Sequence, residues 1–251
     1  MKRDGEVGGA PEASGRAQHV SDPGSGGLQA VLFDMDGLLV DSEPLWFEVE
    51  TEIMARMGGA WTHADQQLLV GGPLSHSLGY MLARAPRPVP EETVARWLAG
   101  GITGLVRRHG VPMMPGAREL LAEVSAAGLP CALVTSAQRD LMDAVLETVH
   151  VTFTATVCAD DVRRGKPDPE PYLLVAGLLG LDPGSCVALE DSPNGVASAE
   201  AAGCAVIAVP NVAPVPARPR RVIAASLREV DLARLREVAA SHGRSAVTNE
   251  S

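Results

Sequence analysis

Aromatic residues and long apolar runs are both scarce in this chain. Phe, Trp and Tyr make up 3% of its 251 residues. No run reaches the roughly 18 apolar residues that a membrane-spanning helix requires. The polar, glycine-rich first 27 residues also lack the apolar segment of a signal peptide. We therefore expect a cytoplasmic protein with no membrane partner.

Cysteine is infrequent, and basic charge is not in excess. The four cysteines are widely separated and form no Cys-x-x-Cys pair, which favours reduced, buried thiols over a metal site. Acidic residues outnumber Lys and Arg by 31 to 21, and the formal net charge is −10. Such a charge gives no field that attracts nucleic acid, so we expect no nucleic-acid partner.

The two ends of the chain differ in composition from the rest. Residues 1–27 combine Gly, Ser, Asp and Pro with few large apolar side chains, and residues 241–251 look similar. Both segments are expected to be disordered. At 46% hydrophobic residues, the chain is long enough for one domain and a smaller second one. A monomer is the simplest expectation.

Short apolar runs alternate with amphipathic stretches through most of the chain. Each run is too short and too uniformly apolar for an exposed strand, but fits a parallel strand buried on both faces. This alternation predicts an α/β fold, a Rossmann-like doubly wound parallel sheet built from 28–43 and 113–240. Strands are expected at 30–33, 131–134, 155–158, 186–189 and 205–209, and helices at 116–127, 139–148, 170–179 and 192–202.

The segment 44–112 interrupts this alternation. It contains amphipathic helical patterns but no convincing strand, and it follows the first strand closely. We interpret it as an inserted α-helical cap domain with hinges at Glu43-Pro44 and Val111-Pro112. Because ligands of open α/β sheets bind beyond the carboxyl ends of the strands, such a cap would cover the site.

Polar side chains follow four of the predicted strands. Taken singly, each pair fits a solvated turn or a helix N-cap, and the lysine fits an exposed residue. Independent caps do not explain why carboxylates, hydroxyls and a lysine meet at one sheet edge, so together they point to a shared site. They are Asp34 and Asp36, Thr135 and Ser136, Lys166, and Glu190 and Asp191.

These groups suit phosphoryl transfer. Asp34 and Asp191, with a backbone carbonyl nearby, are oxygen ligands of the kind that Mg²⁺ prefers. One of the first two aspartates can attack phosphorus, and the other can protonate the leaving alkoxide and later deprotonate water. Lys166 and the Ser136 hydroxyl can hold the phosphoryl oxygens. The chemistry predicts a magnesium-dependent phosphatase.

The same residues resemble, in order, the four motifs of the haloacid dehalogenase-like (HAD) superfamily. The motifs are DMDGLLVDSE (34–43), VTS (134–136), GKPDP (165–169) and LEDSPNG (189–195). The insertion resembles the cap of the β-phosphoglucomutase-like and sugar-phosphatase subgroup. The resemblance implies Asp34 as nucleophile, Asp36 as acid/base with its backbone carbonyl on Mg²⁺, Ser136 and Lys166 on phosphate, Asp191 on the metal, and Glu190 on the metal or its water.

Within this subgroup, phosphatases and mutases have to be separated. The mutases carry a histidine where Trp46 stands, and a cap arginine that the segment 71–76 lacks. Both departures favour water as acceptor. We expect a phosphatase that acts on a small phosphorylated metabolite, a sugar or polyol phosphate, through an aspartyl-phosphate intermediate. The alternatives are a phosphosugar mutase of the β-phosphoglucomutase type and a catalytically silent phosphometabolite-binding protein, although a silent protein is expected to lack Asp34, Asp36 or Lys166.

Other candidate residues have plainer interpretations. Trp46, Trp61 and Trp97 are expected in the core of the cap itself. Arg139, just beyond the second motif, is interpreted as a solvated residue of a first helical turn, and His76 as an exposed loop residue.

Overall fold

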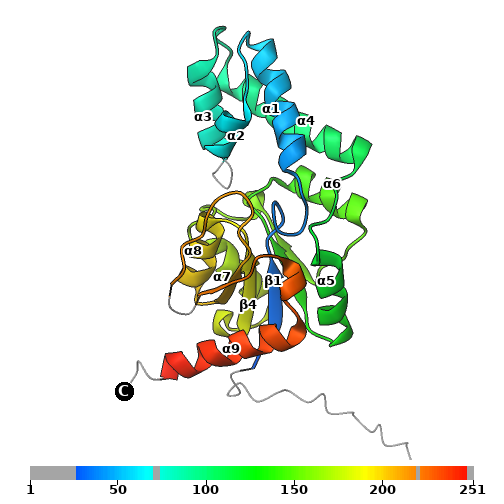
Figure 1. Ribbon diagram of the computed structural model, residues 1–251, viewed down its shortest axis with the longest axis vertical. Coiled ribbons are helices and arrows are strands. Elements are labelled where there is room, and N and C mark those ends of the chain that lie inside the picture. Colours follow the sequence, from blue (N-terminus) through cyan, green and yellow to red (C-terminus); the bar gives the residue numbers. More distant parts are fainter. Residues whose placement is uncertain (1–26, 70–73, 219–220, 248–251) are drawn as a thin grey trace, which may run out of the picture.

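A parallel sheet forms the centre of the larger part of the molecule. The computed structural model describes residues 27–69, 74–218 and 221–247 (Figure 1). The sheet order is β3-β2-β1-β4-β5-β6, and every neighbouring pair is parallel. The predicted Rossmann-like α/β fold is confirmed. The strands are β1 (Ala30–Phe33), β2 (Cys131–Val134), β3 (Ala155–Val157), β4 (Cys186–Glu190), β5 (Ala205–Ala208) and β6 (Arg221–Ile223).

Helices cover both faces of the sheet, as a doubly wound fold requires. On one face, Phe33 of β1 belongs to the same apolar cluster as residues of α5 (Ala117–Ala126), α6 (Arg139–Val149) and α9 (Leu232–Val247). On the other face, Leu32 packs with α7 (Glu170–Leu179) and α8 (Pro193–Ala202). The central strands are buried on both sides, which explains their uniformly apolar sequences.

The register of the sheet brings the predicted polar residues to one edge. Phe33, the last residue of β1, pairs with Leu133 of β2 and with Leu189 of β4. The residues that come next on these three strands therefore lie side by side at the carboxyl edge. This is the edge on which open α/β sheets bind their ligands.

The insertion between β1 and β2 forms a helical cap above that edge (Figure 1). Its helices are α1 (Glu43–Arg56), α2 (His63–Gln67), α3 (Leu74–Arg84) and α4 (Glu91–His109). Buried residues on their inner sides, among them Ile53, Met81 and Leu98, give the cap an apolar interior. The amphipathic patterns in 44–112 thus mark helices that pack on one another.

The two chain segments that join cap and core are hydrogen-bonded to each other. The Asp41 amide donates to the Pro112 carbonyl at 2.9 Å, and the Met114 amide donates to the Leu39 carbonyl at 2.9 Å. Val40 and Met113 form the antiparallel bridge between these bonds. Beyond this bonded pair, α4 of the cap also packs against α6 of the core. The predicted hinge Glu43-Pro44 lies just beyond this bonded pair, whereas Pro112 of the predicted hinge Val111-Pro112 belongs to it; both hinges stay a prediction.

Two parts of the C-terminal region differ from the sequence-based expectation. Helix α9 continues to Val247, so 241–247 is helical where a disordered tail was expected; the His242 ring lies 2.9 Å from the Gly203 carbonyl and ties the helix to the core. Strand β6 was not expected, because it is short and only partly buried. The expected N-terminal tail lies, apart from Gly27, outside the described residues, as do 248–251.

The other expectations from composition concern thiols and membranes. All four cysteines are buried, and none is paired in a disulfide. In the described part of the chain, no helix combines the length and the apolar character needed to cross a bilayer.

Candidate active site

Asp34 and Asp36 lie in a tight turn at the end of β1. The Asp34 amide donates to the Leu189 carbonyl at 3.0 Å, which anchors the turn to β4. Gly37 has φ +79°, a conformation that favours glycine. A Cβ atom on Gly37 would lie 2.2 Å from Oδ2 of Asp191. The glycine of the first motif thus allows the chain to turn directly beside a carboxylate of the fourth.

Lys166 connects three strand ends. Its Nζ donates to Oδ1 of Asp34 at 2.5 Å, to the Val134 carbonyl at 2.8 Å and to Oε1 of Glu190 at 2.6 Å. The side chain is 5% exposed. Burial by itself would lower the pKa of Lys166, but the carboxylates of Asp34 and Glu190 raise it above its ordinary value. The lysine is therefore charged and offsets two buried carboxylates.

Glu190 is fully buried at the end of β4. Its Oε1 accepts hydrogen bonds from Lys166 and from the Tyr172 hydroxyl of α7. Its Oε2 has no hydrogen-bond partner among the described residues, and a Cβ atom on Gly195 would lie 1.8 Å from it. Burial raises the pKa of Glu190, and Lys166 opposes this. Sequence reasoning missed Tyr172, although a tyrosine in an otherwise apolar helix needs a partner for its hydroxyl.

Asp36 lies on the cap side of Asp34. Its Oδ1 accepts a hydrogen bond from the Ser42 hydroxyl at 2.5 Å. Burial and the nearby Asp34 raise the pKa of Asp36 to about 6, although hydrogen bonds from Ser42 and Trp46 act in the opposite direction. A carboxyl group with this pKa can hold a proton and release it close to neutral pH, as general acid/base catalysis requires.

Three carboxylates at this edge form a candidate metal centre. Ligand oxygens of Asp34, Glu190 and Asp191 all lie within 4.8 Å of one another. Lys166 pairs with the first two, whereas Asp191 makes no ion pair with any described residue. Burial, Asp34 and Glu190 raise the pKa of Asp191 well above its ordinary value. Three buried carboxyl groups beside one charged lysine offer oxygen ligands that fit a hard divalent cation.

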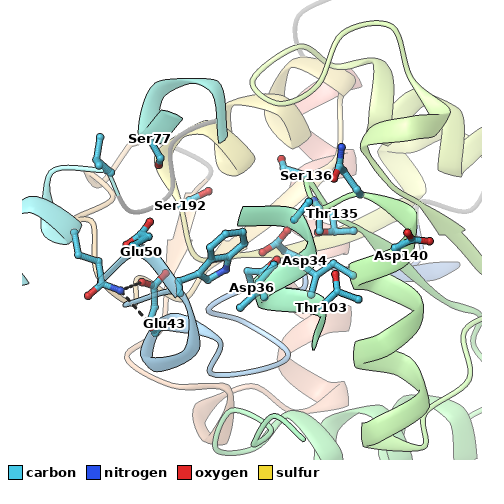
Figure 2. Close-up of a pocket in the computed structure, with 18 of the residues that line it drawn as sticks. Asp34, Asp36, Glu43, Glu50, Ser77, Thr103, Thr135, Ser136, Asp140 and Ser192 are labelled. Carbon is cyan, nitrogen blue, oxygen red and sulfur yellow. Dashed lines mark hydrogen bonds between the residues drawn. The ribbon is translucent and has the colours of Figure 1, made fainter. Parts of the chain in front are cut away.

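The loop after β2 supplies hydroxyl groups to the same place. Thr135 and Ser136 both line the cavity over the strand ends (Figure 2). Ser136 is exposed, whereas Thr135 is 3% exposed and directly follows Val134, whose carbonyl binds Lys166. The Thr135 Oγ1 also accepts a hydrogen bond from the Ala137 amide at 3.0 Å. Thr135 is thus a second candidate for phosphate binding, which sequence reasoning set aside in favour of Ser136.

The cavity lies between the strand ends and the cap and has a volume of about 420 Å³. Figure 2 shows Glu43, Glu50 and Ser77 of the cap on the side of the cavity opposite Thr135 and Ser136. Sequence reasoning gave Glu50 and Ser77 no role, and it placed Glu43 only in the first motif and at a hinge. The sequence did contain an indication that Glu50 has a function. Glu50 follows Val49 on the apolar face of the predicted first cap helix, where a carboxylate is not expected.

Two of the aromatic and basic residues noted in the sequence lie elsewhere than expected. Trp61 is buried in the cap, but Trp46 lines the cavity and contacts Asp36 rather than belonging only to the cap core. Arg139 is not simply solvated, because it pairs with Asp161 and Thr156 at the edge of the sheet. His76 is exposed as expected, but it lies in helix α3 and not in a loop, while 71–73 lie outside the described residues.

Comparison with known proteins agrees with these motifs. The family model described as haloacid dehalogenase-like hydrolase matches residues 31–209. Hexitol phosphatase B of Escherichia coli (strain K12) is 35% identical over 188 residues, which cover 73% of this chain and 84% of that protein. Hexitol phosphatase A of the same strain is 36% identical over 202 residues, covering 80% and 88% respectively.

Solved structures resemble the whole arrangement of core and cap. CbbY from Rhodobacter sphaeroides in complex with phosphate has a TM-score of 0.73 at 27% identity, covering 83% of this chain and 99% of that one. A putative beta-phosphoglucomutase from Thermotoga maritima has a TM-score of 0.65 at 28% identity, covering 80% and 96%. The motifs, the fold and these matches show that the chain belongs to the haloacid dehalogenase-like hydrolase family.

Proposed function

We propose that the protein is a Mg²⁺-dependent phosphatase that hydrolyses a small phosphomonoester, a sugar or polyol phosphate, through an aspartyl-phosphate intermediate. The observation that carries this proposal is the placement of Asp34, Asp36 and Lys166 together in the cavity between core and cap. Similarity to two hexitol phosphatases supports the substrate class. The cytoplasm as location and a monomeric state belong to the same proposal.

In the first step, Asp34 attacks phosphorus and Asp36 acts as acid. A carboxylate oxygen of Asp34 forms a bond to phosphorus in line with the leaving oxygen, and the ester P–O bond breaks. The electron pair goes to the leaving alkoxide, which takes the proton of Asp36. The raised pKa of Asp36, about 6, supplies protonated carboxyl groups near neutral pH. The alcohol then departs and leaves phosphate on Asp34.

In the second step, Asp36 acts as base. It takes a proton from a water molecule that attacks phosphorus, and the bond between phosphorus and the Asp34 oxygen breaks. Inorganic phosphate and the original carboxylate result. Lys166 and the hydroxyl groups of Thr135 and Ser136 hold the phosphoryl oxygens as their charge is redistributed.

Mg²⁺ would be held by Asp34, by Asp191 and by the Asp36 backbone carbonyl, and by Glu190 either directly or through water. The ion supplies charge neutralisation between the Asp34 carboxylate and the phosphate group. Glu190 also has a separate task in this chain, because it accepts a hydrogen bond from Lys166 and fixes the position of that ammonium group.

Water rather than a second sugar is the proposed acceptor. Trp46 occupies the position where the related mutases carry a histidine, and its ring faces the cavity and contacts Asp36. A tryptophan N–H can donate a hydrogen bond but cannot take up a proton. The cap would exclude bulk water from the first step and would open to release the alcohol.

The test is phosphate release from a panel of phosphorylated hexitols, sugars and nucleotides, with Mg²⁺ and with EDTA. We expect Mg²⁺-dependent release from hexitol and sugar phosphates, and none above background for Asp34→Asn. Glu48→Gln, an exposed change in α1, is the matched control and should retain full activity. Release that persists in Asp34→Asn, or no release from any compound, would rule the proposal out.

A further inference from the structure

The cap side of the cavity carries buried polar side chains that the two catalytic steps do not use. Glu50 of α1, Ser77 of α3 and Thr103 of α4 are 5%, 9% and 8% exposed, and all three line the cavity. They come from three different helices, so no single amphipathic pattern accounts for them. Burying such groups costs free energy unless something hydrogen-bonds to them.

Glu50 lines the cavity with a carboxylate group of which one oxygen is bound by a described residue. Its Oε2 accepts a hydrogen bond from Nε1 of Trp61 at 2.9 Å, which fixes the carboxylate in place. Its Oε1 has no donor among the residues that the structure describes. Burial raises the pKa of Glu50 to about 7, as expected of a carboxyl group with too few partners. A hydrogen-bond donor on a ligand would satisfy this oxygen.

The charges around the cavity limit what that ligand can be. Glu43 lies beside Glu50 (Figure 2), and among the described residues only the Gln66 side-chain amide donates a hydrogen bond to its carboxylate, at 3.1 Å. Of the described lining residues, Lys166 and Arg107 are basic. Lys166 serves the reacting phosphate, and the half-exposed Arg107 lies 4.0 Å from Glu147. A second phosphate placed against Glu43 and Glu50 would face carboxyl groups.

We propose that Glu50 and Ser77 on one side of the cavity, and Thr103 on the other (Figure 2), bind the hydroxyl groups of an uncharged polyol or sugar, so that the site selects monophosphates and discriminates against bisphosphates. The inference rests on the proposed function and adds the residues that recognise the leaving alcohol. Glu50 acts as a specificity residue, because its acceptor oxygen recognises a donor and its ionised form repels an anion.

The experiment compares Glu50→Gln with wild type on two substrates, a hexitol 6-phosphate and p-nitrophenyl phosphate. The second compound has no sugar hydroxyl groups for Glu50 to bind. If the amide oxygen keeps the Trp61 bond, the amide NH₂ faces the cavity and presents a donor where the substrate needs an acceptor. We expect the ratio of kcat/KM for the hexitol phosphate to kcat/KM for p-nitrophenyl phosphate to fall about ten- to a hundredfold. Glu48→Gln should leave this ratio unchanged.

A second comparison tests the discrimination by charge. Wild type should turn over fructose 6-phosphate at least about tenfold more efficiently than fructose 1,6-bisphosphate, and Glu50→Gln should narrow that difference.

Thr103→Val, which preserves side-chain volume, should also lower the ratio of hexitol phosphate to p-nitrophenyl phosphate turnover. This variant tests the inference if Glu50→Gln does not fold. Thermal unfolding of each variant reports on folding.

The outcomes separate this inference from the proposed function. If wild type hydrolyses neither p-nitrophenyl phosphate nor the hexitol phosphate, the phosphatase proposal fails. If it hydrolyses both, while folded Glu50→Gln and Thr103→Val keep the wild-type ratio, the role of the cap residues is overturned. Bisphosphate turnover equal to that of the monophosphate would also overturn it.

Discussion

Glu190 shows how closely single residues around the site depend on one another. It is held by Lys166 and Tyr172 on one carboxylate oxygen, and its other oxygen lies against the backbone at Gly195. The glycine in the fourth motif is required for space, because its φ is not in the left-handed region. No such requirement can be derived from the sequence, since it depends on how α8 approaches the end of β4.

A pair of glycine substitutions tests this close approach. Gly195→Ala would place a Cβ atom 1.8 Å from Oε2 of Glu190, so Glu190 must move and its bond to Lys166 is disturbed. We expect a loss of about 3 kcal/mol or more in the free energy of unfolding. Gly177→Ala in α7 is the control, because a Cβ atom there meets nothing within 4 Å, and it should stabilise by up to about 1 kcal/mol. Urea unfolding measures both, and equal effects would contradict the steric explanation.

The acid/base role of Asp36 leads to a kinetic prediction. In Asp36→Asn, p-nitrophenol should still leave in the first step, because it is a good leaving group that needs no proton. Breakdown of the aspartyl-phosphate needs the base and should become slow. A stopped-flow trace is therefore expected to show a burst of about one p-nitrophenol per enzyme. Linear release without a burst would mean that Asp36 does not act in the second step.

Among the elements, the central strands were predicted closely and the edges less well. The first two strands were predicted to the residue and the next three to within one residue at one end. Strands β1, β2, β4 and β5 are buried on both faces and have largely apolar sequences, whereas β3 is an edge strand that is only partly buried. Strand β6 lacks that signature. Arg221 at its start forms two hydrogen bonds of 2.7 Å to Glu200, so an ion pair and not an apolar run secures this edge strand.

Helix α1 contains two carboxyl groups that should make stability depend on pH. Burial raises the pKa of Glu43 and of Glu50 from 4.5 to about 7. Between these values the folded protein binds protons that the unfolded chain has released, so stability must fall as the pH rises from about 4.5 to about 7. Each pKa unit corresponds to about 1.4 kcal/mol, which limits the contribution of Glu50 to about 3 kcal/mol.

The measurement is the melting temperature in EDTA at several values between pH 5 and pH 8. We expect wild type to lose stability across this range, and Glu50→Gln to lose clearly less, because the amide does not titrate. Glu48→Gln should follow wild type, since this side chain is exposed. A Glu50→Gln curve parallel to wild type would show that Glu50 has an ordinary pKa in the folded protein.

At the scale of the whole molecule, core and cap together determine the charge inside the cavity. Asp34, Glu190 and Asp191 cluster on the core side, while Glu43 and Glu50 lie on the cap side. The four motifs allowed the core cluster to be predicted from the sequence, because their strand ends meet at one edge. The cap side was not predictable, because which helix faces turn toward the core depends on how the cap packs.

The core cluster predicts that a divalent cation stabilises the folded protein. Mg²⁺ in excess over its Kd should raise the melting temperature, because the ion binds the folded state and relieves repulsion among buried carboxylates. Asp191→Asn should remove most of this increase, whereas Glu48→Gln should leave it unchanged. Calorimetric titration with Mg²⁺ gives the affinity independently of turnover. An equal increase for Asp191→Asn would place the ion elsewhere.

The bonded pair of segments that joins cap and core also bears on how such a protein can change over evolution. Because Leu39 to Asp41 and Pro112 to Met114 are hydrogen-bonded to each other, the chain enters and leaves the cap at two adjacent points. These hydrogen bonds, and not the cap, fix the distance between the segment that follows β1 and the segment that leads to β2. We therefore expect the core to tolerate exchange of one insertion for another, so that substrate range can diversify while the phosphate chemistry is inherited unchanged.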